Sequence, residues 1–304
     1  MKHKAAILTS ALLFALAAFT AQTVFASDGY TIKKDITFIT RKTGPLTADV
    51  FIPSAPKSSP SPAMVVIHGG GFVTGDKAME NSANVAAYLA SRGYVVFNAN
   101  YRLAKDGGII PENIHDVKCA LKWFRSRAAD YGADPGKISI IGLSAGGYLA
   151  SITAVTAGNP DFEPATCGDE RADAATTEVP FAVIWYGIHD FTTMKSSSAS
   201  MLDSVLFKNA KNKKEFKKKI SPVTYATQAP PMFFLHGLSD SLVPYQQSRE
   251  MCAAMKDAGR DCTQVEYENS DHAFVDLKTG GPGIFNAALK ETADWLDKRF
   301  AELK

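Results

Sequence analysis

The sequence lacks several features that define metal-binding, membrane and nucleotide-binding proteins. It contains only four cysteines in 304 residues, and none lies in a CxxC or Cys/His spacing, so we expect no metal site. After residue 26 no further apolar run reaches the length of about 18 residues that a membrane span requires. The phosphate-binding patterns GxxxxGK[ST] and GxGxxG are also absent. We therefore expect neither a cofactor nor a stable membrane span beyond the N-terminal segment.

A strong excess of one charge is missing as well. The formal net charge is +2 at pH 7, and Lys2 and Lys4 account for it. Without these two residues the basic and acidic side chains balance. Nucleic-acid-binding domains are usually strongly basic, so we expect no nucleic acid among the partners.

The first 26 residues differ in composition from the rest of the chain. A basic start, "MKHK", precedes the apolar run "AAILTSALLFALAAF", and the small residue Ala26 ends the segment. This is the pattern of a secretory signal peptide, and it predicts a secreted or periplasmic mature chain of residues 27–304. An uncleaved anchor is the alternative, although the apolar run is shorter than the roughly 20 residues of a typical span.

Export would bring the cysteines into an oxidising compartment, where disulfides form. Four cysteines allow three pairings. We favour a bridge between Cys252 and Cys262, which would join the end of a helix to the next strand, and a second bridge between Cys119 and Cys167. Buried free thiols remain the alternative, because this cysteine content is not a dense disulfide framework.

Strand-like and helix-like runs alternate along the chain. The patterns predict a hairpin of two strands, then strands that each precede a helix. The expected strands are 31–40, 46–53, 63–67, 94–100, 137–142, 181–187, 231–237 and 262–268. The expected helices are 81–93, 111–132, 145–157, 245–258 and 285–300. This order predicts a single α/β domain with a mostly parallel central sheet and helices on both faces.

One segment interrupts the alternation. Residues 191–222 form an insertion that includes "KNAKNKKEFKKK", with seven lysines between 208 and 219. A run of like charge usually marks a solvated helix face. The alternative is a surface that docks an acidic polymer or an anionic membrane.

The stretch "GLSAG", residues 142–146, lies between a predicted strand and a predicted helix. In the pattern Gly-x-Ser-x-Gly the glycines allow a sharp strand-to-helix turn that exposes the serine hydroxyl at the positive end of the helix. The sequence therefore predicts Ser144 as a nucleophile.

A serine hydroxyl needs a base, and the base needs a carboxylate that orients it. His272 and Asp240 follow two later strands, in the chain order that such a sheet requires. Asp190 also follows a strand end and is the second candidate for the carboxylate, whereas Asp271 is poorly placed to reach the ring of its own neighbour. We interpret the remaining candidate histidines as structural: His68, His115, His189 and His236.

The stretch "HGGG", residues 68–71, directly follows a buried strand. Attack of Ser144 on a carbonyl creates a negative oxygen that needs prearranged donors. The backbone N–H groups of Gly70, Gly71 and Ala145 are the predicted oxyanion hole. We expect His68 to brace this loop rather than to transfer protons.

With these motifs in place, the chain resembles the α/β-hydrolase superfamily, and within it the HGGG-type carboxylesterases. This group includes hormone-sensitive-lipase-like enzymes and acetyl or feruloyl esterases. The matching motifs span most of the chain in the family order: "HGGGF" (68–72), "NYRLA" (100–104), "GLSAGG" (142–147), "SPVTY" (221–225), "HGLSDSLVP" (236–244) and "DHAF" (271–274). The resemblance implies an α/β-hydrolase fold with the catalytic triad and oxyanion hole named above.

The predicted function is hydrolysis of carboxylic esters through a serine acyl-enzyme, without a cofactor. The expected substrates are small acyl or aryl esters, including acetyl or feruloyl groups on polysaccharide. The family's usual proline and glutamate after "YRLA" are replaced here by "KDGGII", which leaves the substrate class open. A peptidase or amidase on the same fold and a non-catalytic binding protein remain alternative functions.

Overall fold

The computed structural model describes residues 24–27, 29–196 and 198–303. Most of the predicted signal peptide, residues 1–23, therefore lies outside the described residues, and its cleavage stays a prediction. Over the ranges that are described, no helix combines the length and the apolar character needed to cross a membrane.

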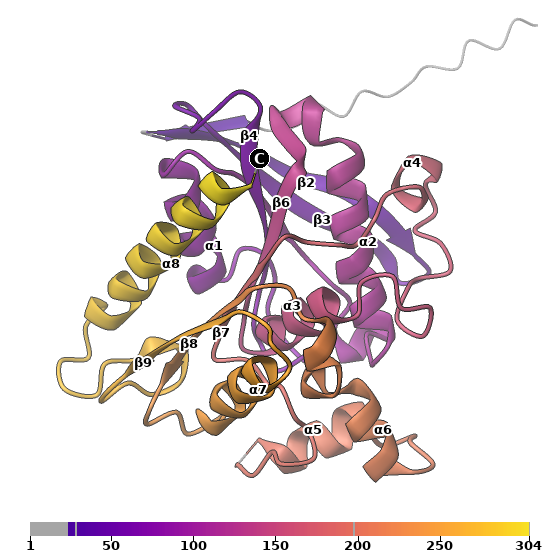
Figure 1. The fold of residues 1–304 in the computed structure, drawn as a ribbon. Helices are drawn as coiled ribbons and strands as arrows, with labels where there is room; N and C mark the ends of the chain where they lie inside the picture. The colour runs from indigo at the N-terminus through magenta and orange to yellow at the C-terminus, as the bar shows by residue number, and fades with distance from the viewer. Residues whose placement is uncertain (1–23, 28, 197, 304) are drawn as a thin grey trace, which may run out of the picture.

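A twisted sheet forms the centre of the described chain (Figure 1). Its order is β1-β2-β3-β5-β4-β6-β7-β8-β9. The first four strands in that order pair antiparallel, and every pair from β5 onward is parallel. The strands are β1 Val24–Ser27, β2 Tyr30–Arg41, β3 Gly44–Pro53, β4 Ser61–Ile67, β5 Val95–Ala99, β6 Ala133–Leu143, β7 Ala182–Trp185, β8 Met232–Gly237 and β9 Cys262–Tyr267.

The central strands are short apolar runs because both of their faces are covered. Every residue of β4, β5, β7 and β8 is buried, which is the pattern of parallel strands between two helical layers. Strands β2 and β3 instead form the predicted hairpin at one side of the sheet, joined by a tight turn. The mostly parallel sheet predicted from the sequence is confirmed.

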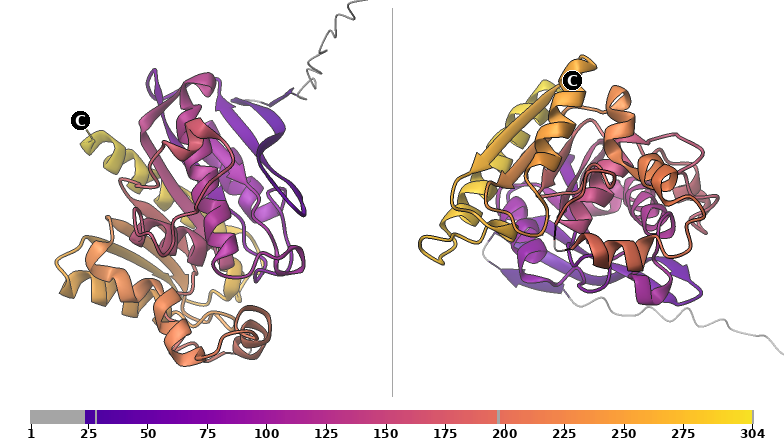
Figure 2. Two further views of the ribbon diagram at one scale, coloured as in Figure 1. Left: turned by 90° about the vertical axis from the view of Figure 1, so that its right-hand side faces the viewer. Right: turned by 90° about the horizontal axis from the view of Figure 1, so that it is seen from below.

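Helices cover the sheet on both faces, as Figures 1 and 2 show. Helices α1 and α8 pack on one face with one group of apolar side chains, and α2, α3 and α7 pack on the other face with a second group. The α-helices are α1 Glu80–Ser91, α2 Glu112–Ser126, α3 Ala145–Val155, α4 Glu170–Asp173, α5 Ala199–Leu206, α6 Lys213–Ile220, α7 Gln246–Asp257 and α8 Gly283–Glu302. Short 3-10 helices are η1 Ala104–Asp106, η2 Ala128–Tyr131, η3 Pro222–Gln228 and η4 His272–Phe274.

One predicted helix is shorter than the sequence pattern indicates. The expected helix 111–132 ends as α2 at Ser126, and a separate 3-10 turn, η2, follows. The break lies at Arg127, whose backbone leaves the helical region at φ −125° and ψ 12°. Its guanidinium is 2.5 Å from a carboxylate oxygen of Asp169. This ion pair lies outside the helix, so the apolar spacing along the sequence does not reveal it.

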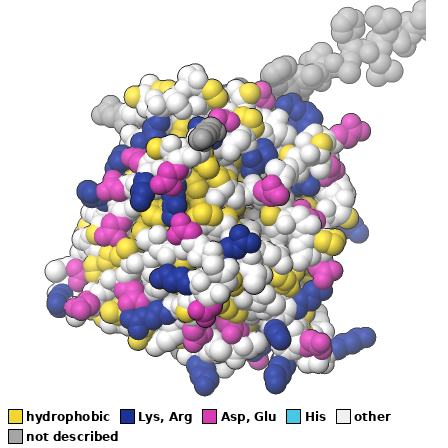
Figure 3. All heavy atoms as spheres, in the orientation of Figure 1, with side chains coloured by type: hydrophobic (Ala, Val, Ile, Leu, Met, Phe, Trp, Pro, Cys, Tyr) yellow, Lys and Arg dark blue, Asp and Glu magenta, His cyan; other side chains and the backbone are white. Residues whose placement is uncertain are grey.

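The insertion at 191–222 folds as α5 and α6, at the bottom of Figure 1. Two lysines of α6 pair with nearby acids: Lys217 with Asp203 at 2.5 Å and Lys219 with Asp161 at 2.9 Å. Figure 3 shows acidic and basic side chains intermixed over the visible face, with basic ones at its lower edge. These contacts account for part of the lysine run as ordinary surface ion pairs.

Both favoured disulfides occur in the structure. Cys119 on α2 joins Cys167 across 48 positions of sequence, and Cys252 on α7 joins Cys262 at the start of β9 across 10 positions. The first bridge ties the loop after α3 to the helical layer. The second closes the connection between a helix and its following strand, as the sequence pattern indicates.

Candidate active site

Ser144 occupies the sharp turn between β6 and α3. Its φ of +55° and ψ of −118° are strained for a residue with a side chain. The backbone N–H of Ser144 donates to the carbonyl oxygen of Trp185, at the end of β7, over 2.9 Å. The neighbouring strand therefore holds the turn in place, and the hydroxyl stands at the N-terminus of a fully buried helix.

The glycines that flank Ser144 are required by close backbone approach. A Cβ atom on Gly146 would lie 2.2 Å from the carbonyl oxygen of Ile67, and one on Gly142 would lie 2.0 Å from the carbonyl oxygen of Gly146. Such distances are far below van der Waals contact. The Gly-x-Ser-x-Gly pattern thus lets α3 pack directly against the end of β4.

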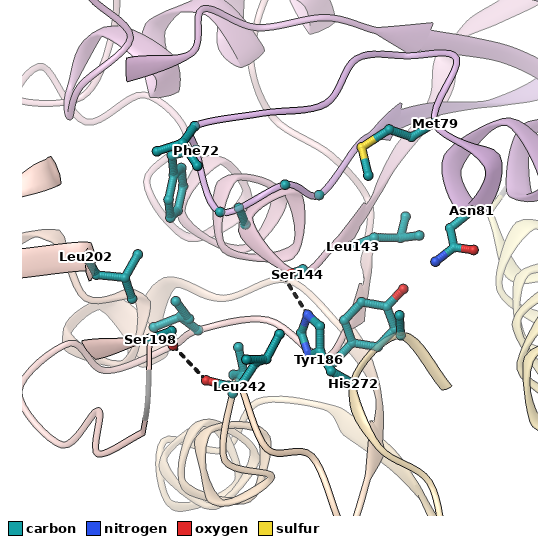
Figure 4. A pocket seen from close by; sticks show the side chains of 18 of the residues that line it. Phe72, Met79, Asn81, Leu143, Ser144, Tyr186, Ser198, Leu202, Leu242 and His272 are labelled. Carbon is teal, nitrogen blue, oxygen red and sulfur yellow. Dashed lines mark hydrogen bonds between the residues drawn. The ribbon is translucent and has the colours of Figure 1, made fainter. Parts of the chain in front are cut away.

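The structure brings Ser144, His272 and Asp240 together. The ring of His272 lies with Nε2 at 2.9 Å from Ser144 Oγ and Nδ1 at 2.8 Å from Asp240 Oδ2; Figure 4 marks the first contact. Asp240 lies in the loop after β8, and His272 begins η4 after β9. A neutral imidazole that donates from Nδ1 to the carboxylate presents Nε2 as the acceptor for the serine proton.

The carboxylate of Asp240 is buried, but both of its oxygens accept hydrogen bonds. Its Oδ1 accepts the backbone N–H groups of Leu242 and Val243, at 3.0 and 2.8 Å. Burial alone raises the pKa of such a carboxyl, but the hydrogen bonds from His236 and His272 outweigh this effect. The pKa of Asp240 therefore lies well below its usual range, and the group stays ionised at neutral pH.

Asp271 has a role that the sequence analysis missed. Its Oδ1 accepts the backbone N–H of His272 at 2.7 Å and that of Ser241 at 2.8 Å. Asp271 does not reach the ring of its neighbour, as expected, but it ties together the two loops that carry His272 and Asp240.

The HGGG loop supplies backbone donors beside Ser144. Gly69, Gly70, Gly71 and Ala145 all line the same cavity as Ser144. Within residues 29–196 and 198–303, the N–H groups of Gly70, Gly71 and Ala145 donate to no other protein group. At Gly70, φ is +110° and a Cβ atom would lie 2.0 Å from the carbonyl oxygen of Thr74, so only glycine is compatible with this loop.

His68 braces this loop. Its Nδ1 lies 2.7 Å from the carbonyl oxygen of Gly69, and its ring stacks on Tyr101 at a centroid distance of 4.4 Å. Burial lowers the pKa of His68 to about 4, so the ring is neutral at physiological pH. The hydroxyl of Tyr101 also approaches the backbone carbonyl oxygens of the loop, at 3.3 and 3.4 Å.

The other candidates for base or carboxylate lie elsewhere. Asp190 accepts hydrogen bonds from Thr192 and makes no contact with His272. His189 lies 3.1 Å from Ser151 Oγ, and burial lowers its pKa to about 3. His115 lies on α2. His236, in contrast, touches Asp240, with its Nε2 at 3.2 Å from Oδ2.

A cavity of about 360 Å³ opens in front of Ser144. Among the described residues that line it there is no Asp, Glu, Lys or Arg. Figure 4 shows apolar side chains that surround the serine and the imidazole. They come from five separate parts of the chain: Phe72, Val73, Met79, Leu143, Tyr186, Ile188, Met201, Leu202, Leu242 and Val243.

Two contributions to this cavity were not predicted. The insertion provides one wall, because Met201 and Leu202 of α5 line the cavity. Tyr186, directly after β7, packs edge-on against the His272 ring at a centroid distance of 4.8 Å. Its φ is +40°, which is strained for an aromatic residue. No motif marks either contribution in the sequence, since both depend on how distant segments pack.

The sheet order, the strand-to-helix turn at Ser144 and the loops at the carboxyl ends of the strands define an α/β-hydrolase. The chain belongs to the BD-FAE family, whose model matches residues 48–255.

Curated relatives agree with this assignment. The chain is 36% identical over 222 residues to the probable carboxylic ester hydrolase LipM of Mycobacterium tuberculosis. This alignment covers 70% of this chain and 49% of LipM. The chain is also 33% identical over 220 residues to the esterase LipQ of the same organism. This alignment covers 70% of this chain and 50% of LipQ. The chain thus spans about half the length of these relatives.

Solved structures share the whole fold. A truncated carbohydrate esterase from gut microbiota superposes with a TM-score of 0.76 at 25% identity, covering 91% of this chain and 99% of that chain. A propionate-bound esterase 2 from Thermogutta terrifontis superposes with a TM-score of 0.71 at 25% identity, covering 94% and 97% respectively.

Proposed function

We propose that this protein is a serine hydrolase of carboxylic esters. The observation that carries the proposal is the hydrogen-bonded series of Ser144, His272 and Asp240, at 2.9 and 2.8 Å, beside free backbone donors. Acyl transfer needs a nucleophile, a base with an orienting acid, and donors for an oxyanion, and each of these groups lies in one cavity.

In the proposed reaction, Ser144 Oγ attacks the ester carbonyl carbon while His272 Nε2 takes the hydroxyl proton. The tetrahedral oxygen accepts hydrogen bonds from the N–H groups of the oxyanion loop and of Ala145. The C–O bond to the alcohol then breaks, and His272 returns the proton to the leaving alcohol. Water then loses a proton to His272 and attacks the acyl carbon; the bond between that carbon and Ser144 Oγ breaks, and His272 returns the proton to Oγ, which restores the enzyme.

The cavity is lined mainly by apolar side chains, which supports the proposal that it binds an apolar acyl or aryl group of the substrate. A volume of about 360 Å³ exceeds the needs of an acetyl group, and few polar side chains are present to bind sugar hydroxyls. Apart from Ser144, His272 and Tyr186, the polar side chains among the described lining residues are those of Asn81, Ser82 and Ser198. We therefore propose that a sugar, if it is the alcohol, extends out of the cavity, as it would in a feruloyl ester of polysaccharide.

Export is the second part of the proposal. The segment 1–26 has the pattern of a signal peptide, and two disulfides suit an oxidising compartment. N-terminal sequencing of protein collected outside the cytoplasm is expected to begin at Ser27. A chain that keeps residues 1–26 after export would contradict cleavage.

The direct test combines hydrolysis with active-site labelling. Wild-type protein is expected to hydrolyse p-nitrophenyl acetate and to be labelled by a fluorophosphonate probe at Ser144. The Ser144→Ala variant is expected to fold, to lose hydrolysis and to escape labelling. Unlabelled wild-type protein would favour a non-catalytic binding protein, and faster cleavage of anilides than of matched esters would favour an amidase.

A further inference from the structure

A second histidine lies behind the proposed triad. His236 is the penultimate residue of β8 and lies four positions before Asp240, and its side chain and that of Asp240 are both fully buried. Its Nε2 lies 3.2 Å from Asp240 Oδ2, the same oxygen that faces His272 Nδ1 at 2.8 Å. Two imidazole nitrogens therefore lie close to one carboxylate oxygen.

The partners of His236 define its tautomer. Nε2 faces two groups that only accept hydrogen bonds, the carboxylate of Asp240 and the carbonyl oxygen of Val243 at 2.9 Å. It must therefore carry the hydrogen. Nδ1 lies 2.8 Å from Ser248 Oγ on α7, whose hydroxyl donates to it. The serine on α7 thus orients the ring so that Nε2–H donates to the carbonyl oxygen of Val243 and lies beside the carboxylate of Asp240.

Hydrogen bonds link His236, Val243 and Asp240, and they stabilise the turn after β8 that carries the acid. The backbone N–H of Val243 donates to Asp240 Oδ1, and its carbonyl oxygen accepts from His236. One imidazole therefore holds the turn that positions the carboxylate and lies in contact with the carboxylate itself. His236 has no exposed surface and makes no contact with Ser144, which excludes it as the base.

We propose, on the basis of the proposed function, that His236 is a positioning residue for Asp240: its Nε2–H holds the turn at Val243 and lies 3.2 Å from Oδ2, which keeps the carboxylate directed at His272 and offsets part of its charge. The other titratable groups near this pair come from each neighbouring element: Tyr186, His189, Glu266, Asp271 and His272. His189 lies near His236 and makes no contact with the triad, so it provides a matched control.

The test compares His236→Leu, which removes the donor, with His236→Gln, whose amide restores a donor near Nε2. His236→Leu is expected to lower kcat for p-nitrophenyl butyrate about 10- to 100-fold, the order of effect of one polar interaction that supports a charged group, with KM little changed. The acidic limb of kcat/KM is expected to move upward by about 0.5–1 pH unit, because an unshared carboxylate charge retains the proton on His272 more strongly. His236→Gln is expected to recover most of the loss.

Two further variants keep the test decisive. Ser248→Ala leaves the buried ring in place but frees its tautomer, so a smaller change in the same direction is expected even where His236→Leu does not fold. His189→Leu is expected to lower the melting temperature without moving the acidic limb. Wild-type kcat and pH profile in folded His236→Leu or in Ser248→Ala would overturn the proposal, and so would His236→Gln no better than His236→Leu.

A readout without turnover separates this proposal from the esterase function. The Nδ1–H proton of His272, followed by NMR in histidine-labelled protein, reports its hydrogen bond to Asp240 directly. Its resonance is expected to shift in His236→Leu and in Ser248→Ala but not in His189→Leu. A shift in a protein that hydrolyses no ester would refute the esterase function alone, whereas unchanged resonances in an active enzyme would refute the role of His236 alone.

Discussion

Met201 on the insertion helix faces Gly71 of the HGGG loop. A Cβ atom on Gly71 would lie 3.3 Å from Met201 Cε, and the methionine side chain is 37% exposed. The insertion therefore forms part of the wall of the cavity that opens above Ser144, opposite the proposed oxyanion donors. A helix that the sequence marks only by its neighbouring lysines thus lines the cavity in which a substrate would bind.

The first prediction concerns Met201→Gln, which keeps the volume of the side chain and makes it polar. Each buried methylene contributes about 0.8 kcal/mol, or about fourfold in kcat/KM. Wild-type kcat/KM is therefore expected to rise from p-nitrophenyl acetate to the hexanoate, and the variant is expected to lose about fourfold or more of that rise. Val275→Thr is the control, because Val275 is 51% exposed and does not line the cavity. Equal chain-length profiles for wild type and Met201→Gln would contradict a role for α5 in selection.

The second prediction concerns Gly70→Ala. The added Cβ would collide with the carbonyl oxygen of Thr74 and would strain a φ of +110°, so the oxyanion loop must shift. Loss of a donor typically costs about 10²–10³ in kcat, and steady-state kinetics are expected to show this loss with a smaller change in KM. Gly158→Ala is the matched control, since Gly158 also has positive φ, at +72°, but no neighbour within 4 Å. It is expected to lower stability by about 1 kcal/mol and to leave kcat unchanged; an equal loss of kcat in both variants would argue against the oxyanion assignment.

The third prediction concerns acid stability. The folded-state pKa of Asp240 lies well below its ordinary value of 3.8, so the folded protein binds a proton there less readily than the unfolded chain. The resulting stabilisation is complete above the ordinary pKa and is lost as pH falls from about 4 toward the lower folded-state pKa. Denaturant unfolding between pH 2 and 7 is expected to show a steeper loss of stability below pH 4 for wild type than for Asp240→Asn. Parallel curves would refute the depressed pKa.

The same Asp240→Asn variant tests the proposed mechanism. An amide cannot stabilise the imidazolium that forms when His272 takes the proton, and it favours the wrong tautomer. The expected loss in kcat at pH 7 is on the order of 10⁴. Asp190→Asn is the control for the alternative carboxylate and is expected to keep wild-type kcat. A larger loss in Asp190→Asn would reverse the assignment of the acid.

The fourth prediction ranks the two disulfides. In the loop-entropy model a bridge across 48 positions stabilises by about 4 kcal/mol and one across 10 positions by about 2.7 kcal/mol. The double variant Cys119→Ala/Cys167→Ala is therefore expected to lose more unfolding free energy than Cys252→Ala/Cys262→Ala. Chemical denaturation of both variants measures the difference, and the reverse order would show that native contacts outweigh loop entropy here.

The sequence predicted the strands, the turn at the nucleophile and the chain order of the proposed triad, because a local pattern encodes each of them. Alternating apolar runs predict a buried parallel sheet, and Gly142 and Gly146 around Ser144 predict a tight strand-to-helix turn. Since parallel strands present their carboxyl ends at one edge, Asp240 and His272 were expected to meet there. The predicted end of the helix 111–132 was wrong, because the apolar spacing continues past Arg127, where the backbone leaves the helical region.

The sequence by itself therefore determined the class of fold and which three side chains meet. Only the tertiary structure decided what surrounds them: the bridge that Asp271 makes between two loops, the ring of Tyr186 against His272, the imidazole of His236 behind Asp240, and the wall that Met201 provides. Each of these depends on segments distant in sequence that pack against one another. Local propensity and periodicity report which face a residue presents, but not which neighbour it will meet.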